Sequence, residues 1–257
     1  MSLNGKRVVG VIPSRWGSSR FPGKSLAPIA GRPLVLRVLD RVGLAKSLDE
    51  ALVATDDQRI FDAVTAAGGR TVMTRPDHPS GTDRIAEAIA GVEADVVVNI
   101  QGDEPLIDPA LIDAVAGALC EPGEPRWEMS TAATPIRDAA SLHSPDVVKV
   151  VCDAAGGALY FSRSPIPFVR GAAAGFPPVE GEHWRHVGIY GYRRDFLRRL
   201  VATPPCALEQ LEKLEQLRAL SLGAGIRVLP CEEPGVGVDT PEDVARVEAL
   251  LAARGEA

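Results

Sequence analysis

The stretch GSSRFPGKS, residues 17–25, combines glycines, hydroxyl groups and cations, which are the groups that bind phosphate. It resembles the P-loop of ATPases and GTPases, but that motif has four residues between its first glycine and Gly-Lys-Ser/Thr. Here five residues intervene, and Pro28 and Pro33 follow where a P-loop continues into a helix. This loop is therefore not a P-loop, and any phosphate binding needs another geometry.

Three cations, Arg15, Arg20 and Lys24, lie in or beside this loop. Together with exposed backbone N–H groups, they predict a pocket for a triphosphate. The alternative is a solvated basic loop. The surrounding prolines and glycines favour a fixed shape and hence the pocket.

Acidic residues follow two later strand-like segments. Asp103 and Glu104 come in the turn of NIQGDEP (residues 99–105), which we expect to expose both side chains, and Asp239 immediately precedes a helix. Each alone is compatible with turn formation or helix capping. Two carboxylates at strand ends opposite a cationic loop predict a metal–triphosphate site, because Mg²⁺ needs few protein ligands and takes the rest from phosphates and water.

A third group of polar residues lies later in the chain. His186 and Tyr190 have equal parity in a predicted strand, so their side chains share one face and suit a polar substrate, or simply the surface of a sheet. His183 and His186 form an H-x-x-H pair, but a loop position with no third ligand argues against zinc.

The elements that must position these residues alternate between short β-branched runs and amphipathic helices, which predicts an α/β fold with a mostly parallel sheet. Ligands of such sheets sit beyond the carboxyl ends of the strands. The predicted strands are 7–13, 50–55, 70–73, 95–101 and 129–135, and the predicted helices are 33–45, 57–67, 83–90 and 109–119.

From about residue 145 to 195 the pattern changes to a small antiparallel extension. Its strands are expected at 147–153, 158–163 and 186–193, with a flap or dimerisation arm at 164–185. A helix at 208–222, a strand at 226–230 and a final helix, opened by a capping box at Thr240, complete a single domain over 1–257.

Composition limits the function classes. The net charge of −6 argues against a general nucleic-acid or anionic-membrane binder, because such proteins need a net basic face. Four scattered cysteines favour neither a disulfide framework nor zinc and fit a reducing compartment. No membrane-spanning run or signal pattern is present, so we expect a cytoplasmic protein.

The chain resembles the 3-deoxy-manno-octulosonate (Kdo) cytidylyltransferases, or CMP-Kdo synthetases, a branch of the sugar-acid cytidylyltransferases. The resemblance runs nearly end to end. It is carried by VIPSR (11–15), FPGK (21–24), ATD (54–56), SGTDR (80–84), NIQGDEP (99–105), VVKVV (147–151), YFSR (160–163), HVGIYGY (186–192), LEQLR (214–218) and GVDTPED (237–243).

The resemblance implies a Rossmann-like nucleotidyltransferase, usually a homodimer, that couples CTP to Kdo with Mg²⁺ and supplies CMP-Kdo for lipopolysaccharide synthesis. By position, Arg15, Lys24 and Asp103 would be catalytic, and Arg15, Lys24, Ser80 and Gln101 would contact the nucleotide. Asp103 and Asp239 would hold magnesium. The residues that would face the sugar acid are Gln101, Arg163, His186, Tyr190 and a carboxylate of the LEQLE helix, taken as Glu209.

Such a reaction needs no protein nucleophile. The anomeric hydroxyl of the sugar acid attacks the α-phosphorus of CTP and diphosphate leaves, so the main task is to stabilise charge on the phosphoryl oxygens. Arg163 suits the sugar carboxylate because a guanidinium binds it in a bidentate manner.

Three alternatives stay open. One is a cytidylyltransferase for a related acid, such as 8-amino-Kdo or a sialic acid. Another is a nucleotide-binding regulator without chemistry, against which both Asp103 and Asp239 speak. The third, a dinucleotide-dependent oxidoreductase, is disfavoured because the first loop lacks G-x-G-x-x-G.

Overall fold

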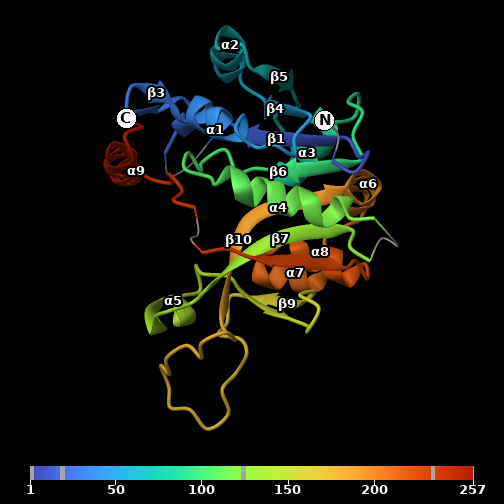
Figure 1. Ribbon diagram of the computed structural model, residues 1–257, viewed down its shortest axis with the longest axis vertical. Coiled ribbons are helices and arrows are strands. Elements are labelled where there is room, and N and C mark those ends of the chain that lie inside the picture. The colour runs from blue at the N-terminus through green and yellow to red at the C-terminus, as the bar shows by residue number, and fades with distance from the viewer. Residues whose placement is uncertain (1–2, 18–20, 123–125, 233–234, 257) are drawn as a thin grey trace.

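The computed structural model describes residues 3–17, 21–122, 126–232 and 235–256, and helices cover both faces of a central sheet (Figure 1). The strands of this sheet are β1 (Val8–Ser14), β4 (Glu50–Thr55), β5 (Arg70–Met73), β6 (Val96–Asn99), β7 (Met129–Pro135), β8 (Lys149–Cys152), β9 (Ala158–Ser162), β10 (Trp184–Arg193) and β11 (Ile226–Pro230). The helices are η1 (Lys24–Leu26), α1 (Leu34–Val42), α2 (Gln58–Ala66), α3 (Gly81–Ala88), α4 (Pro109–Cys120), α5 (Ala139–His143), α6 (Arg194–Ala202), α7 (Ala207–Glu212), α8 (Gln216–Ser221) and α9 (Pro241–Arg254). A short hairpin pairs β2 (Pro28–Ile29) with β3 (Arg32–Pro33).

The sheet is mostly parallel, which confirms the predicted α/β class. Within the described residues its main path runs β11-β7-β10-β6-β1-β4-β5. β1 lies parallel between β4 and β6, and β7 pairs parallel with β11. β10 joins these two parallel groups by pairing antiparallel with both β6 and β7.

The core forms one layer on each face of the sheet, because successive side chains of a strand point to opposite faces. In β1, Val8 and Ile12 join the layer formed with α1, α4 and α9, whereas Val9 and Val11 join the layer formed with α3, α6 and α8. Burial on both faces explains why the central strands read as continuous apolar runs. No helix in the described part of the chain is both long and apolar enough to cross a membrane.

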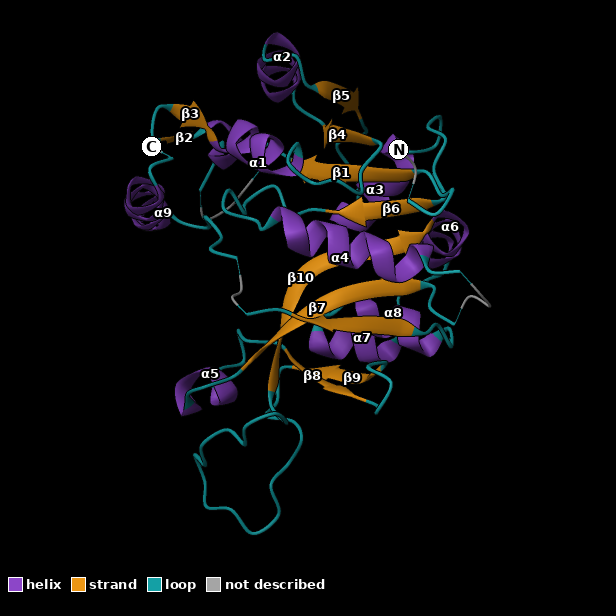
Figure 2. Ribbon diagram, viewed as in Figure 1, coloured by secondary structure: helices purple, strands orange, loops and turns teal. Residues whose placement is uncertain are grey.

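The predicted extension is antiparallel. β8 pairs with β9 and with the start of β10, and the loop between β9 and β10 projects from the body of the molecule (Figures 1 and 2). His183 ties the end of this loop, since its Nδ1 accepts from the backbone N–H of Val179 at 2.8 Å and its Nε2 lies 3.0 Å from the carbonyl of Pro167.

One predicted element is wrong. The expected helix at 208–222 is broken into α7 and α8, because Lys213 adopts the left-handed conformation with φ 55° and ψ 48°. The predicted capping box at Thr240 is present at the start of α9, where the carboxylate of Asp243 accepts from the Thr240 N–H at 2.9 Å.

Candidate active site

A polar pocket lies beyond the carboxyl ends of β1 and β6, where the loops after these strands meet the start of α3. The residues that line it from the cationic loop and the end of β1 include Ser14, Arg15, Lys24 and Ser25, and those from other parts of the chain include Ser80, Gly81, Arg84, Gln101, Asp103, Glu215 and Asp239. We call this the first pocket. It is the place that the parallel strands of an α/β sheet predict for a ligand.

Lys24 lies between the two acidic residues that the sequence singled out. Its Nζ is 2.7 Å from Asp103 Oδ2 and 3.1 Å from Asp239 Oδ1, and it also donates to the Val238 carbonyl at 3.1 Å. The expected juxtaposition of the cationic loop with both carboxylates is confirmed. Residues separated by more than 200 positions thus converge on one point, at the opening of α9.

Backbone geometry places these carboxylates. A Cβ on Gly102 would lie 2.7 Å from the carbonyl oxygen of Pro13, so only glycine lets the turn after β6 pack against the end of β1. The N–H of Val238 then donates to the Asp103 carbonyl at 2.8 Å, which joins the two acid-bearing loops. The positions of Asp103 and Asp239 are therefore coupled through the main chain.

The cationic loop has a fixed shape in its described part. Gly23 has φ 72°, and its N–H donates to the carbonyl of Trp16 at 3.1 Å, while the indole leaves no room for a Cβ at Gly23. The guanidinium of Arg59 lies 3.3 Å from the centre of the Trp16 ring. Lys24 opens a single 3₁₀ turn and not a long helix, in agreement with the exclusion of a P-loop. Arg20, the third predicted cation, lies outside the described residues.

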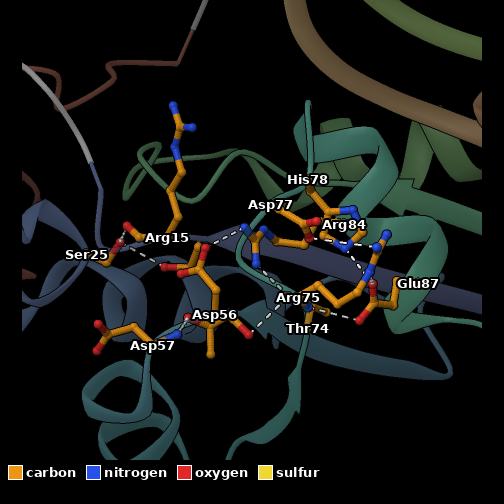
Figure 3. A network of polar contacts seen from close by, with 12 residues as sticks. Arg15, Ser25, Asp56, Asp57, Thr74, Arg75, Asp77, His78, Arg84 and Glu87 are labelled. Carbon is orange, nitrogen blue, oxygen red and sulfur yellow. Dashed lines mark hydrogen bonds and ion pairs between the residues drawn. The ribbon is translucent and has the colours of Figure 1, made fainter.

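Arg84 is a cation of the first pocket that sequence reasoning did not assign. Although it is buried, it lines the pocket, and its guanidinium donates to Asp56 Oδ2 at 2.6 Å and to Thr74 Oγ1 at 2.5 Å (Figure 3). In the same view the guanidinium of Arg15 stands apart from this network. The signal for Arg84 was its place in SGTDR, one helical turn after Ser80.

Ser80 is the N-cap of α3. Its Oγ accepts from the Asp83 N–H at 3.2 Å and donates to the Asp83 carboxylate at 2.7 Å. The helix therefore directs its N-terminus, with its partial positive charge, at the first pocket.

A second pocket adjoins the first, and Gln101, Gly81 and Glu215 line both. The remaining polar residues that line the second pocket are Thr82, Asn99, Tyr190, Tyr192, Lys213 and Gln216. Gln101 spans the junction, and its Nε2 donates to the Gly188 carbonyl at 2.7 Å. The two pockets are therefore contiguous.

His186 and Tyr190 share one face of β10, as their parity predicts, with ring centres 5.3 Å apart. Tyr190 lines the second pocket, whereas His186 lies behind it, against Phe161 and the Oγ1 of Thr131. Thr131 has one hydroxyl proton and directs it at backbone carbonyls, so the Nε2 of His186 is the donor in their 2.9 Å contact. Burial lowers the pKa of His186 to about 3 and raises that of Tyr190, and both groups are neutral at physiological pH.

Glu209, which was expected to face the sugar acid, lies outside the residues that line either pocket. Both of its carboxylate oxygens accept from Arg218, at 2.8 and 2.6 Å, in a buried pair between α7 and α8. A buried carboxylate needs such a partner. The residues of this region that reach the pockets are Glu215 and Gln216. The sequence repeats Leu-Glu-Gln-Leu at 208–211 and 214–217, and the second copy is the one at the site.

Arg163 lies at the end of β9, outside the residues that line either pocket. Its guanidinium donates to the carbonyls of Glu212 and Pro145, at 2.7 and 2.8 Å. Its predicted contact with a sugar carboxylate stays a prediction.

Glu104 does not share the exposure that we expected for its turn. Its Oε2 is buried beneath Gly235, and this burial, together with the charge of Asp103, raises the pKa of Glu104 to about 7. In the described residues no three His, Cys, Asp or Glu side chains gather in a way that would hold a metal ion. A cation at Asp103 and Asp239 would need further ligands from a substrate.

The comparisons with known proteins agree with this geometry. Residues 9–227 match the family model described as cytidylyltransferase. The chain is 49% identical over 247 residues to the 3-deoxy-manno-octulosonate cytidylyltransferase of Syntrophotalea carbinolica, covering 95% of this chain and 98% of the relative. The chain belongs to the 3-deoxy-manno-octulosonate cytidylyltransferase family. It is therefore a nucleotidyltransferase.

Solved structures place this cytidylyltransferase in the same fold group. One is a CMP:2-keto-3-deoxy-manno-octonic acid synthetase complexed with CTP, which is 43% identical with a TM-score of 0.89 over 96% of this chain and 99% of that one. Another is the 4-diphosphocytidyl-2C-methyl-D-erythritol synthase of Anaerococcus prevotii, at 16% identity and a TM-score of 0.63 over 97% and 98%. The second likeness shows the fold alone. The Rossmann-like nucleotidyltransferase fold expected from sequence is confirmed.

Proposed function

We propose that this cytidylyltransferase transfers CMP from CTP to the anomeric hydroxyl of Kdo and releases diphosphate. The observation that carries the proposal is the convergence of Lys24, Asp103 and Asp239 in a pocket that continues, through Gln101 and Glu215, into a second polar pocket. One pocket suits a nucleoside triphosphate and the other a polyhydroxy acid. The names of the relatives specify CTP and Kdo.

The triphosphate would occupy the first pocket. Lys24 and Arg15 supply positive charge there, and the N-terminus of α3 adds a partial positive charge. Arg84 is held by Asp56 and keeps a fixed orientation toward the pocket wall. These fixed charges stabilise the charge that develops on the phosphoryl oxygens without rearrangement during the reaction.

The two carboxylates that contact Lys24, those of Asp103 and Asp239, are suitable ligands for magnesium. Two carboxylates converge on the Lys24 ammonium group, so this point already holds a cation, and carboxylate oxygens are the ligands that Mg²⁺ prefers. Asp103 and Asp239 would hold the ion, and substrate oxygens and water would complete its coordination. Bound there, Mg²⁺ would polarise the α-phosphate and lower the pKa of the attacking hydroxyl.

The sugar acid would occupy the second pocket. Gln216 is buried there, and its Nε2 has no hydrogen-bond partner in the described residues, so it can donate to a ligand oxygen. Glu215 presents one carboxylate oxygen to Thr82 at 2.7 Å and lines both pockets. Neutral His186 behind Tyr190 fixes the orientation of that ring, which supplies a phenol to the pocket.

We further propose that the chain works as a cytoplasmic homodimer whose product supplies lipopolysaccharide synthesis. The loop between β9 and β10 projects from the body and exposes 75% of Phe168, which supports its assignment as a dimerisation arm. The four described cysteines are free, which fits a reducing compartment.

One assay tests the function. Diphosphate release is measured with CTP and Mg²⁺ against Kdo, 8-amino-Kdo and a sialic acid. We expect kcat/KM to be highest for Kdo by at least about tenfold, because a site that hydrogen-bonds its substrate rejects analogues that leave its polar groups unpaired. A higher value for another acid would reassign the substrate, and no release with any acid would refute the proposal.

A further inference from the structure

Glu212 connects the end of α7 to the end of β9, although it lines neither pocket. Its carboxylate accepts from the hydroxyl of Ser162 at 2.7 Å and from the N–H of Arg163 at 2.9 Å. Its own carbonyl accepts from the Nε of Arg163 at 2.7 Å. Three hydrogen bonds thus hold the last residue of α7 against the antiparallel extension.

The main chain at the end of β9 is held in place by a buried lysine. Lys149 is fully buried, and its Nζ donates to the carbonyls of Arg163, Val147 and Ser144 at 2.5, 2.6 and 2.9 Å. A buried ammonium group that satisfies all three of its donors on the main chain fixes that main chain strongly. Glu212 is therefore tied to a rigid part of the molecule.

The next residue, Lys213, makes the turn between α7 and α8 in the left-handed conformation. This conformation is unfavourable for a residue with a Cβ, because the Cβ comes too close to the following carbonyl oxygen. The turn is nevertheless what brings Glu215 and Gln216 to the pocket wall, because a continuous helix would carry them onward in another direction. The backbone N–H groups of Lys213 and Leu214 cap α7 at the Glu209 carbonyl, and Glu212 adds the contacts that tie this end of α7 to β9.

We propose that Glu212 is a positioning residue of this enzyme, which holds Lys213 in its left-handed turn and thereby sets Glu215 and Gln216 in the second pocket. The proposal rests on the proposed function where it takes the sugar acid as the ligand of that pocket. The carboxylate of Glu212 hydrogen-bonds directly to a hydroxyl and a backbone N–H, and its charge also favours the charged form of the nearby Lys149.

The first test compares Glu212→Ala with Glu212→Gln. The glutamine can still accept from the Arg163 N–H and donate to Ser162, so we expect its KM for Kdo to stay within about twofold of the original enzyme. The alanine loses both bonds and should raise KM for Kdo by about tenfold, with KM for CTP changed less than about twofold. An equal loss in the two variants, or an equal effect on both substrates, would overturn the proposal.

A double-mutant cycle tests whether Glu212 acts through the turn. Glycine adopts the left-handed conformation without strain, so Lys213→Gly removes the need for Glu212 to hold it. Glu212→Ala should therefore raise KM for Kdo less in the Lys213→Gly background than in the original chain. The two fold-increases in KM should differ by a factor of at least about three. The same effect in both backgrounds would show that Glu212 does not act through residue 213.

Amide hydrogen exchange separates this proposal from the proposed function, because it requires no turnover. Glu212→Ala should accelerate exchange at residues 213–217 by about tenfold while Glu212→Gln leaves it unchanged, since local opening becomes easier when the anchor is lost. Unchanged exchange in the alanine variant would overturn the positioning role. Failure of the original enzyme to use Kdo would instead refute the function.

Discussion

Lys24 is the residue on which the first pocket is organised, because it brings the carboxylates of Asp103 and Asp239 to one point. Asp103→Asn keeps the shape of this carboxylate but removes its charge. We expect kcat to fall by roughly 10²–10³-fold, the loss typical for one electrostatic stabiliser. The Mg²⁺ concentration that gives half-maximal activity should rise. Steady-state kinetics over a magnesium titration would measure both, with thermal melting to show that the fold persists.

Asp195→Asn is a matched control for this prediction, since the Asp195 side chain is 99% exposed on α6. It should leave kcat and the magnesium dependence unchanged. Near-normal turnover in Asp103→Asn, or an equal loss in both variants, would contradict the metal assignment.

His186 gives the stability of the protein a predictable dependence on pH. Burial lowers its pKa from 6.5 to about 3, so the fold favours the neutral ring. The contribution of the neutral ring to the free energy of unfolding is fully present above pH 6.5 and is lost as the pH falls toward 3. At pH 5 the loss is about 2 kcal/mol. Urea unfolding at pH 5 and 7.5 should show this loss in the original chain and a smaller one in His186→Gln. Equal losses would mean that His186 does not bind a proton on unfolding.

Much of the site was predictable at the residue scale, because a sequence shows the type of each residue and its position relative to the ends of predicted strands. Lys24, Asp103 and Asp239 were found from charge and spacing, and the structure brings them together. The sequence did not indicate that Glu215 lines the pockets and Glu209 does not, because two copies of Leu-Glu-Gln-Leu have the same local pattern. Only the tertiary pairing of Glu209 with Arg218 decides which copy is internal.

At the scale of elements, strands were predicted best where β-branched runs have clear boundaries. The predicted 50–55, 70–73, 129–135 and 226–230 coincide with β4, β5, β7 and β11. The break between α7 and α8 could not be predicted, because Lys213 is neither proline nor the glycine or asparagine that usually adopts the left-handed conformation at a helix end. The antiparallel place of β10 between β6 and β7 likewise depends on non-local pairing, and α5 and α6 were missed because they are short or follow a strand directly.

The pair of α7 and α8 is held from the inside by the buried ion pair of Glu209 and Arg218. Glu209→Ala leaves the guanidinium buried without its carboxylate and should lower the free energy of unfolding by about 3 kcal/mol. Asp77→Ala, which breaks the exposed pair with Arg75, should lower it by less than about 1 kcal/mol. Urea unfolding would measure both. If Glu209→Ala instead weakened sugar-acid binding without loss of stability, Glu209 would be a substrate residue after all.

At the scale of the whole molecule, the projecting loop between β9 and β10 presents an exposed aromatic residue, Phe168. Phe168 packs edge-to-face on Phe176 of the same loop, and 75% of it is exposed. In the proposed twofold dimer Phe168 would be buried twice, once from each copy. Phe168→Asp should therefore weaken dimerisation roughly thousandfold, since each buried phenylalanine contributes about 2 kcal/mol.

Sedimentation velocity across a concentration series would detect this change as a shift from dimer to monomer at micromolar protein. Leu44→Asp provides the matched control, because Leu44 is also exposed, at 60%, but lies just after α1 on another part of the surface. It should leave the dimer intact. A dimer that survives Phe168→Asp would assign the interface to another surface, such as the exposed leucines of α7, and a monomeric original chain would refute the homodimer itself.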